Sequence, residues 1–331
     1  MGGSSYSDDM YRHRIASKVA RGVPIFDHDH DVKTGKAPMA AHATLNPRGV
    51  TRESRDSDAH PESTAIGIIF DVTGSMASVP EVLQKKLPQL MGLLLRKAYI
   101  KDPQILFGAV GDYIADKIPL QIGQFESGVE MDDDVTKIVL EGGGGGSYEE
   151  SYLEALYFFA KHTSTDCFEK RGKKGYLFLI GDEKPYPSLT KKELDEVLGD
   201  TVQAEVTAEE VIALASEKWE IFFLIPKGTN HYSDPGLKAR WDGLLNPQHV
   251  MKLEEPEAVC EVIGSAIGLM EGTVDGLGVA KDLADIGTAG HIVDAATAAL
   301  DPLAKSTALA KAATSSSELA PSGGPSGVDR L

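Results

Sequence analysis

The sequence has little cysteine, no long apolar run and few basic residues. Cys167 and Cys260 are its only two cysteines in 331 residues, which excludes a disulfide framework and a cysteine-rich zinc site. No apolar run approaches the roughly 20 residues of a membrane span. The first residues, MGGSSYSDDMYRHR, lack the apolar core of a secretory signal. We therefore expect a cytoplasmic protein with no membrane partner.

Basic residues are in deficit, because 33 Lys and Arg stand against 50 Asp and Glu, for a net charge of −17. Residues 1–60 carry +1 and residues 272–331 carry −3, so the segment between them carries −15. A chain this acidic is repelled by nucleic-acid phosphates, so we expect no nucleic-acid partner. The acidic middle is a suitable place to hold a cation, although negative charge also serves solubility.

The most informative stretch is residues 65–75, AIGIIFDVTGS. Its uncharged, isoleucine-rich start predicts a strand buried on both faces. Three oxygen-bearing side chains follow at a spacing of two, Asp71, Thr73 and Ser75, and Gly74 allows a tight turn between them. A carboxylate and two hydroxyls at the end of a central strand suit Mg²⁺ or Mn²⁺. The alternative is a strand, a hydroxyl that caps the next helix, and no metal.

Two further buried strands are each followed by an aspartate. Residues 104–111 (QILFGAVG) precede Asp112, and residues 175–181 (GYLFLIG) precede Asp182. In an open α/β sheet the carboxyl ends of parallel strands form the edge at which ligands bind. Asp112 and Asp182 thus each follow a predicted buried strand, as Asp71 does.

Between these strands lies a glycine-rich stretch, residues 141–150, EGGGGGSYEE. Ordering five consecutive glycines costs backbone entropy, so a close approach of the backbone to another group is expected there. A flexible linker is the alternative, and it is weakened by the patterned helix that starts directly after the glycines.

Strands that alternate with helices predict an α/β fold with a doubly wound, mostly parallel sheet flanked by helices. Residues 61–271 form the expected domain, which should fold alone, between a polar N-terminal extension (1–60) and an Ala- and Gly-rich C-terminal extension (272–331). In the extensions, DHDHD at 27–31 is interpreted as a solvated loop, with metal binding as the alternative. Residues 279–311 are expected to form weak helices, and residues 315–331 a disordered tail. The further strands are expected at 119–125, 220–226 and 249–253, and helices at 80–99 (kinked or split at Pro88), 190–198, 207–218, 234–245 and 257–270.

The DVTGS motif at 71–75, the glycine-rich loop and Asp182 together resemble the von Willebrand factor type A (VWA) family and its metal-ion-dependent adhesion site (MIDAS). The resemblance covers about residues 61–271 and implies a Rossmann-like fold. It also implies a Mg²⁺ or Mn²⁺ site built from Asp71, Thr73, Ser75, a loop hydroxyl and Asp182, with Asp112 supporting them. The family usually has a threonine in the loop, and residues 141–150 contain none. Ser147 is the chemical substitute, and a shifted register would place Tyr148 there instead.

In the VWA family the ion keeps one coordination position open for an acidic side chain of a partner. Intracellular members often work beside AAA+ ATPases or as scaffold subunits. The resemblance therefore implies a metal-dependent adaptor or scaffold in a multiprotein assembly, whose partner presents an Asp or Glu, rather than an enzyme.

Two other functions remain open from the sequence. A metal-dependent phosphotransferase or hydrolase could use Asp71, but the haloacid dehalogenase pattern requires a second aspartate where this chain has Thr73. A nucleotide-binding module could use the glycines at 142–146, although they match G-x-G-x-x-G only weakly and lack the Lys of a P-loop. No G-x-S-x-G nucleophile motif is present.

Overall fold

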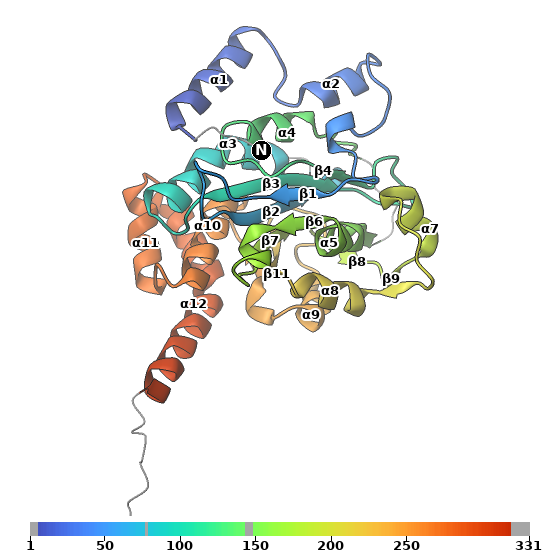
Figure 1. Ribbon diagram of the computed structural model, residues 1–331. Helices are drawn as coiled ribbons and strands as arrows, with labels where there is room; N and C mark the ends of the chain where they lie inside the picture. The colour runs from blue at the N-terminus through green and yellow to red at the C-terminus, as the bar shows by residue number, and fades with distance from the viewer. Residues whose placement is uncertain (1–5, 77–78, 143–147, 319–331) are drawn as a thin grey trace, which may run out of the picture.

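The computed structural model describes residues 6–76, 79–142 and 148–318, and a six-stranded sheet lies at its centre (Figure 1). The strands lie in the order β12-β11-β7-β2-β3-β4, and neighbours are parallel except for β3 and β4. The expected mostly parallel sheet is thus confirmed. Its strands are β2 (Thr64–Asp71), β3 (Pro103–Val110), β4 (Leu120–Ile122), β7 (Gly175–Ile180), β11 (Trp219–Pro226) and β12 (Val250–Leu253).

The sheet extends in both directions from β2. This strand pairs along its whole length with β3 and over five residues with β7 on its other side. Successive side chains of a strand point to opposite faces. Accordingly, Ile66, Ile68 and Phe70 pack into one apolar core, whereas Ala65 and Ile69 pack into the other. All eight residues of β2 are buried because both faces of the sheet are covered.

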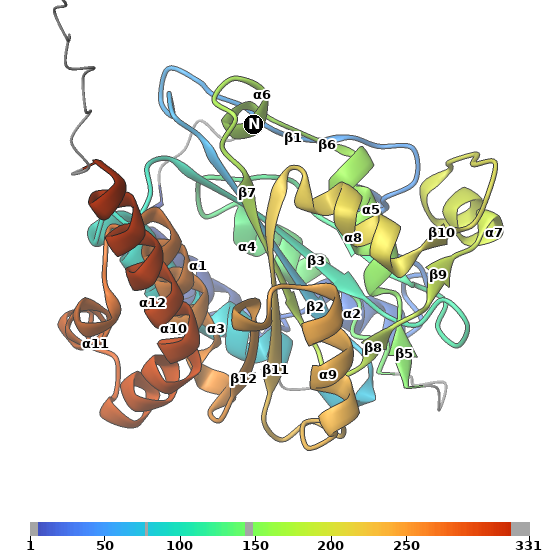
Figure 2. The same ribbon diagram turned by 90° about the horizontal axis from the view of Figure 1, so that it is seen from below.

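Helices cover both faces, as the two views show (Figures 1 and 2). One face carries α3 (Val79–Met91), α4 (Met131–Lys137), α10 (Val259–Glu271), α11 (Gly276–Asp285) and α12 (Gly290–Glu318). The other face carries α5 (Tyr152–Lys161), α8 (Ala208–Ser216) and α9 (Pro235–Leu244). The helices expected at 207–218, 234–245 and 257–270 are therefore present as α8, α9 and α10.

Shorter elements complete the described chain. They are α1 (Asp8–Ala20), α2 (Asp27–Lys33), η1 (Ala43–Leu45), β1 (Arg52–Ser54), η2 (Gly74–Met76), η3 (Gly92–Arg96), β5 (Glu149–Glu150), β6 (Thr163–Thr165), α6 (Asp166–Glu169), β8 (Lys184–Pro185), β9 (Ser188–Leu189), α7 (Lys191–Glu193), η4 (Leu194–Leu198), β10 (Val206–Thr207), η5 (Pro247–His249) and η6 (Pro256–Ala258).

The expected helix over 80–99 forms, but Pro88 does not split it. Helix α3 runs through Pro88 to Met91 and continues into the π-helical turn η3. Proline lacks the N–H that would bond the carbonyl of residue 84 in an α-helix. In this structure the hydroxyl of Tyr11 donates to that carbonyl of Gln84. The acceptor is thereby satisfied from α1, which lets the helix continue.

The N-terminal extension packs on the domain. On α1, Arg14 and Lys18 reach the buried carboxylate of Asp132 on α4, at 3.6 and 3.5 Å. The DHDHD run was expected to be a solvated loop, but it forms α2. Asp29 of this helix is buried and accepts a hydrogen bond from the Leu140 N–H at 3.0 Å, so the carboxylate serves to attach α2.

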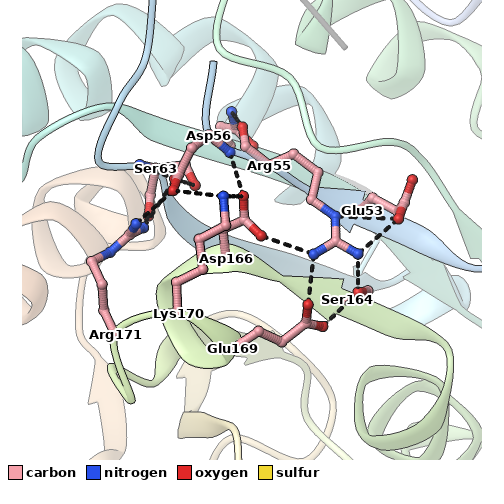
Figure 3. Close-up of polar contacts among 10 residues, drawn as sticks. Glu53, Arg55, Asp56, Ser63, Ser164, Asp166, Glu169, Lys170 and Arg171 are labelled. Atoms are coloured by element: carbon pink, nitrogen blue, oxygen red, sulfur yellow. Dashed lines mark hydrogen bonds and ion pairs between the residues drawn. The ribbon is translucent and has the colours of Figure 1, made fainter. Parts of the chain in front are cut away.

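A charged network fixes the last part of this extension to the domain (Figure 3). Asp56 pairs with Arg171 at 2.7 Å, and Arg55 contacts Asp166 at 2.9 Å. Strand β1, just before these residues, pairs in parallel with β6. Because Ser63 and Arg171 precede β2 and β7, the network lies at the amino ends of these strands. Contacts therefore cross the expected domain boundary at residue 60.

The C-terminal extension also packs on the domain. Val279, Leu283 and Leu300, from α11 and α12, are buried in the same core as α10. Helix α12 continues through 315–318, which the sequence assigned to a disordered tail, and the rest of that tail, 319–331, lies outside the described residues. Within the described chain, no helix combines the length and apolar character needed to cross a membrane.

Candidate functional site

Three neighbouring strands bring the predicted aspartates to one edge of the sheet. Asp71 ends β2, Asp112 follows β3 by two residues, and Asp182 follows β7 by two residues. All three side chains are buried. The charge of Asp182 is close enough to help raise the pKa of Asp71, although burial of Asp71 contributes most to that shift. The structure thus brings together residues that are 111 positions apart in the sequence.

Thr73 is held directly against Asp71. Its main-chain N–H and its hydroxyl both donate to Asp71 Oδ1, at 2.7 and 2.6 Å. A hydroxyl has one proton and two lone pairs. Because the proton is used on Asp71, the Thr73 oxygen has only lone pairs left for any further partner. It is therefore prepared to accept a proton donor or a cation.

The other oxygen of Asp71 is held by a residue that the sequence analysis missed. The hydroxyl of Tyr152, at the start of α5, donates to Asp71 Oδ2 at 3.1 Å. Gly181 makes room for this hydroxyl, because a Cβ there would lie 1.8 Å from the Tyr152 oxygen. The only sequence signals were the helix that follows the glycine-rich loop and the glycine just before Asp182.

Two glutamates, also missed, add to the buried charge. Strands β5 and β8 pair in parallel. Glu150 is on β5, opposite Pro185 of β8, and Glu183 is the residue just before β8. Glu150 is 2% exposed, and its Oε2 has no hydrogen-bond partner in the described part of the structure. Burial raises the pKa of Glu150 and of Glu183, and the charge of Asp71 adds to both shifts.

The remaining aspartates are fixed by hydrogen bonds. Asp182 Oδ2 accepts from the main-chain N–H of His231 at 2.9 Å. Asp112 Oδ1 accepts from the Ile114 N–H at 2.9 Å and from the Tyr186 hydroxyl at 2.7 Å. These contacts orient both carboxylates at the edge of the sheet.

The other two predicted hydroxyl ligands, Ser75 and Ser147, have side chains that lie outside the described part of the structure. Ser75 lies in η2, but its side chain is outside the described part of the structure, as are all of Ser147 and residues 143–146. The loop starts beside the site, since the Gly142 N–H donates to Val72 O at 3.2 Å. Tyr148, the alternative to Ser147, is 63% exposed, and its ring contacts that of His231 edge-on at 4.9 Å between centroids.

The oxygen atoms at this edge of the sheet suit a hard cation only if groups other than carboxylates supply part of its coordination. Across the described ranges, no three His, Cys, Asp or Glu side chains are grouped so that they could hold a metal ion by themselves. Hydroxyls and water would have to complete the coordination, as is common for Mg²⁺. The available lone pairs of Thr73 and the unbonded oxygen of Glu150 are donors of the required kind.

A cleft of about 460 Å³ leads to Thr73. Its lining includes Ile25 and Phe26, from the segment around α2, and Val72 and Met76, from the segment after β2. Thr73 lines this cleft, although its side chain is nearly buried. The site is therefore approached through a mainly apolar opening.

No protein-family model and no curated protein matches the chain. Among solved structures, the pilus adhesin SpaC from Lactobacillus rhamnosus GG aligns over 67% of this chain and 32% of its own, with 10% identity and a TM-score of 0.46. Proximal thread matrix protein 1 from the mussel byssus aligns over 63% of this chain and 46% of its own, with 11% identity and a TM-score of 0.39. This chain thus spans about a third of the adhesin's length, and likenesses this distant say nothing about what it binds.

Proposed function

We propose that this chain is a metal-dependent protein-binding module of the VWA type, with its MIDAS at the carboxyl edge of β2, β3 and β7. The observation that carries the proposal is the pair formed by Asp71 and Thr73. Both donors of Thr73 are used on Asp71, which leaves the threonine oxygen as an acceptor, and Thr73 lines a cleft. This arrangement favours a cation over an anion.

The charge of the site supports the same proposal. Asp71, Glu150 and Glu183 are carboxylates whose pKa values are raised, first by burial. In the described part of the chain, no Lys or Arg side chain forms an ion pair with Asp71 or Glu150. Buried charge of one sign is costly unless protons or a cation balance it. A divalent cation would remove that cost.

Thr73, Ser75, Ser147, Asp71 and Asp182 would hold Mg²⁺ or Mn²⁺, partly through water. When bound, the ion supplies positive charge that attracts an acidic side chain of a partner. Thr73 and Asp71 orient the site, and the cleft walls exclude water around the entering residue. A partner segment with an Asp or Glu beside an apolar residue fits this opening, as in an adaptor or scaffold of a larger assembly.

The experiment recovers a partner from the native host with the full chain as bait, and compares capture with Mg²⁺ and with EDTA. Thr73→Val removes the hydroxyl but keeps the shape, whereas Thr73→Ser keeps the hydroxyl and serves as the matched control. We expect EDTA and Thr73→Val to abolish capture and Thr73→Ser to retain it. A partner captured equally in all four conditions would place the interaction elsewhere and refute the proposal.

Two further measurements, phosphate release and stabilisation by nucleotide, distinguish this proposal from the alternatives left open by the sequence. A phosphotransferase or hydrolase that uses Asp71 would release phosphate from a phosphoester, and Asp71→Asn would abolish the release. A nucleotide module that uses residues 142–146 would be stabilised by nucleotide without added metal. We expect neither effect in the purified protein.

A further inference from the structure

Helices α11 and α12 lie side by side in both views (Figures 1 and 2). A groove of about 700 Å³ runs between the first turn of α11 and one face of α12. On α12, the lining positions recur every three or four residues, which is the spacing of one helix face. The exposed or half-buried ones are Asp294, Thr297, Ala298, Asp301, Ala304, Lys305 and Ala308, and the buried Leu300 lies beneath them.

The groove has an apolar wall and a shallow, small-residue floor. Leu277 lines it and is 90% exposed, the most exposed of the large apolar side chains in the described chain. Ala298 and Ala308 are also exposed and lack bulk, so a second helix could approach α12 closely. A leucine left in water beside such a groove gains from burial when the groove is filled.

The rim of the groove is acidic. Asp275, Asp294 and Asp301 line it, against one basic residue, Lys305. Lys305 is already paired with Asp301 at 2.7 Å. Within the described residues, neither Asp275 nor Asp294 has an ion-pair partner. The rim therefore presents unbalanced negative charge around apolar side chains.

We infer that this groove binds an amphipathic helix of a partner protein, with an apolar stripe toward Leu277 and with Lys or Arg on its flanks. The lining from Asp294 to Ala308 covers about 21 Å of α12, which matches a partner helix of about four turns. A second copy of this chain is a poor occupant, because its net charge of −17 would meet an acidic rim. The inference is independent of the cation site.

The test uses the full chain and a fluorescein-labelled 15-residue helical peptide of Leu and Lys, with leucines at i, i+3, i+4 and i+7. Binding is measured by fluorescence anisotropy at low and high salt. Two peptides serve as controls: a scrambled version with the same composition and no apolar face, and a version with Glu in place of Lys. We expect the amphipathic basic peptide to bind best, and its affinity to fall with salt.

Leu277→Ser should weaken this binding at least about tenfold, because the leucine loses its burial. Asp294→Lys should weaken it by a similar factor, and mainly at low salt. Leu309→Ser is the matched control, since Leu309 is also on α12 and 72% exposed but does not line the groove. Leu277 and Asp294 are exposed, so neither substitution should disturb folding.

Three results would overturn the inference. The first is equal binding by wild type and Leu277→Ser, and the second is equal binding of the Lys and Glu peptides. The third comes from sedimentation velocity: a dimer of the chain that Leu277→Ser abolishes would assign the groove to a second copy.

Discussion

The hydroxyl of Tyr11 donates a hydrogen bond to the main-chain carbonyl of Gln84, 73 residues later in the sequence. Pro88 has no N–H to donate to this carbonyl, so Tyr11 of the N-terminal extension supplies the missing hydrogen-bond donor. Helix α3 begins at Val79, shortly after the Asp71–Met76 segment, and the N-terminal extension also contributes to the lining of the cleft at Thr73. The N-terminal extension is thus part of the surroundings of the candidate site.

Tyr11→Phe should lower the free energy of unfolding by about 1–3 kcal/mol, because a buried carbonyl loses its donor. Urea unfolding measures the change. Tyr232→Phe is the matched control, since its hydroxyl bonds Glu254 at the surface and its loss should be close to neutral. Equal effects of the two substitutions would show that the Gln84 carbonyl finds another donor.

The network in Figure 3 predicts where a stable fragment begins. A chain starting at residue 61 loses β1 and the Asp56–Arg171 pair, so it should unfold at lower urea concentration than one starting at residue 50. Arg171→Ala in the full chain should reproduce part of the loss, because Asp56 then keeps its charge without its main partner. Equal midpoints for the two fragments would support the boundary at residue 60 and an independent 61–271 domain.

Stability should depend on pH through Glu154. Burial raises the pKa of this carboxyl from 4.5 to about 8. The folded chain therefore holds the proton more tightly than the unfolded chain, and stability falls as the pH rises from about 4.5 to about 8. Glu154→Gln should be more stable than wild type at pH 8 by up to a few kcal/mol, with the difference vanishing near pH 4.5. Glu257→Gln is the control, because Glu257 is exposed. A gain in the free energy of unfolding of Glu154→Gln that did not change with pH would contradict the prediction.

Mg²⁺ or Mn²⁺ should raise the melting temperature, by the equivalent of roughly 2.7 kcal/mol at a hundredfold excess over Kd. Asp71→Ala should remove the increment, whereas Asp58→Ala, an exposed aspartate elsewhere, should not. Ser147→Ala should reduce it less than Asp71→Ala, since it deletes a neutral ligand. If Tyr148→Phe reduced it more than Ser147→Ala, Tyr148 would occupy the loop position.

Gly181→Ala should destabilise the fold, because the new Cβ would lie 1.8 Å from the Tyr152 hydroxyl oxygen. Tyr152→Phe removes that oxygen, so the cost of Gly181→Ala should be smaller in the Tyr152→Phe background. It should not vanish, since the next ring atom would be 2.8 Å away. Thermal unfolding of the four variants of this cycle gives the coupling, and additive effects would show that the two residues do not meet.

The strand and helix pattern predicted the mostly parallel sheet, and the resemblance to the VWA family indicated that Asp112 and Asp182 accompany Asp71 at its edge. Long apolar strands have a clear pattern, and parallel strands end at a shared edge. Glu150 and Glu183 could not be found in this way, because β5 and β8 are two residues each and have no period. Tyr152 could not be found in this way either, since its role depends on the room left by Gly181.

The helices expected over 279–311 are present, but the packing of the extensions on the domain was not predicted, for a related reason. Helices α11 and α12 are rich in Ala and Gly, so their apolar pattern is weak, yet Leu283 and Leu300 are fully or almost fully buried by packing on α10. Likewise, DHDHD has no apolar period. Helix α2 is attached to the domain by Asp29, whose carboxylate accepts a hydrogen bond from the Leu140 N–H. Long-range contacts of this kind leave no local signal.

The central position of β2 also sets the order in which a growing chain can assemble. Its first partner, β3, begins 32 residues after β2 ends, but its second, β7, begins only at residue 175. Until then the nascent protein exposes an eight-residue apolar strand with one unpaired edge, which is a template for contact with other chains. Chains that stop before residue 175 should therefore aggregate, and Asp71 meets Asp182 only after residue 182 has been synthesised.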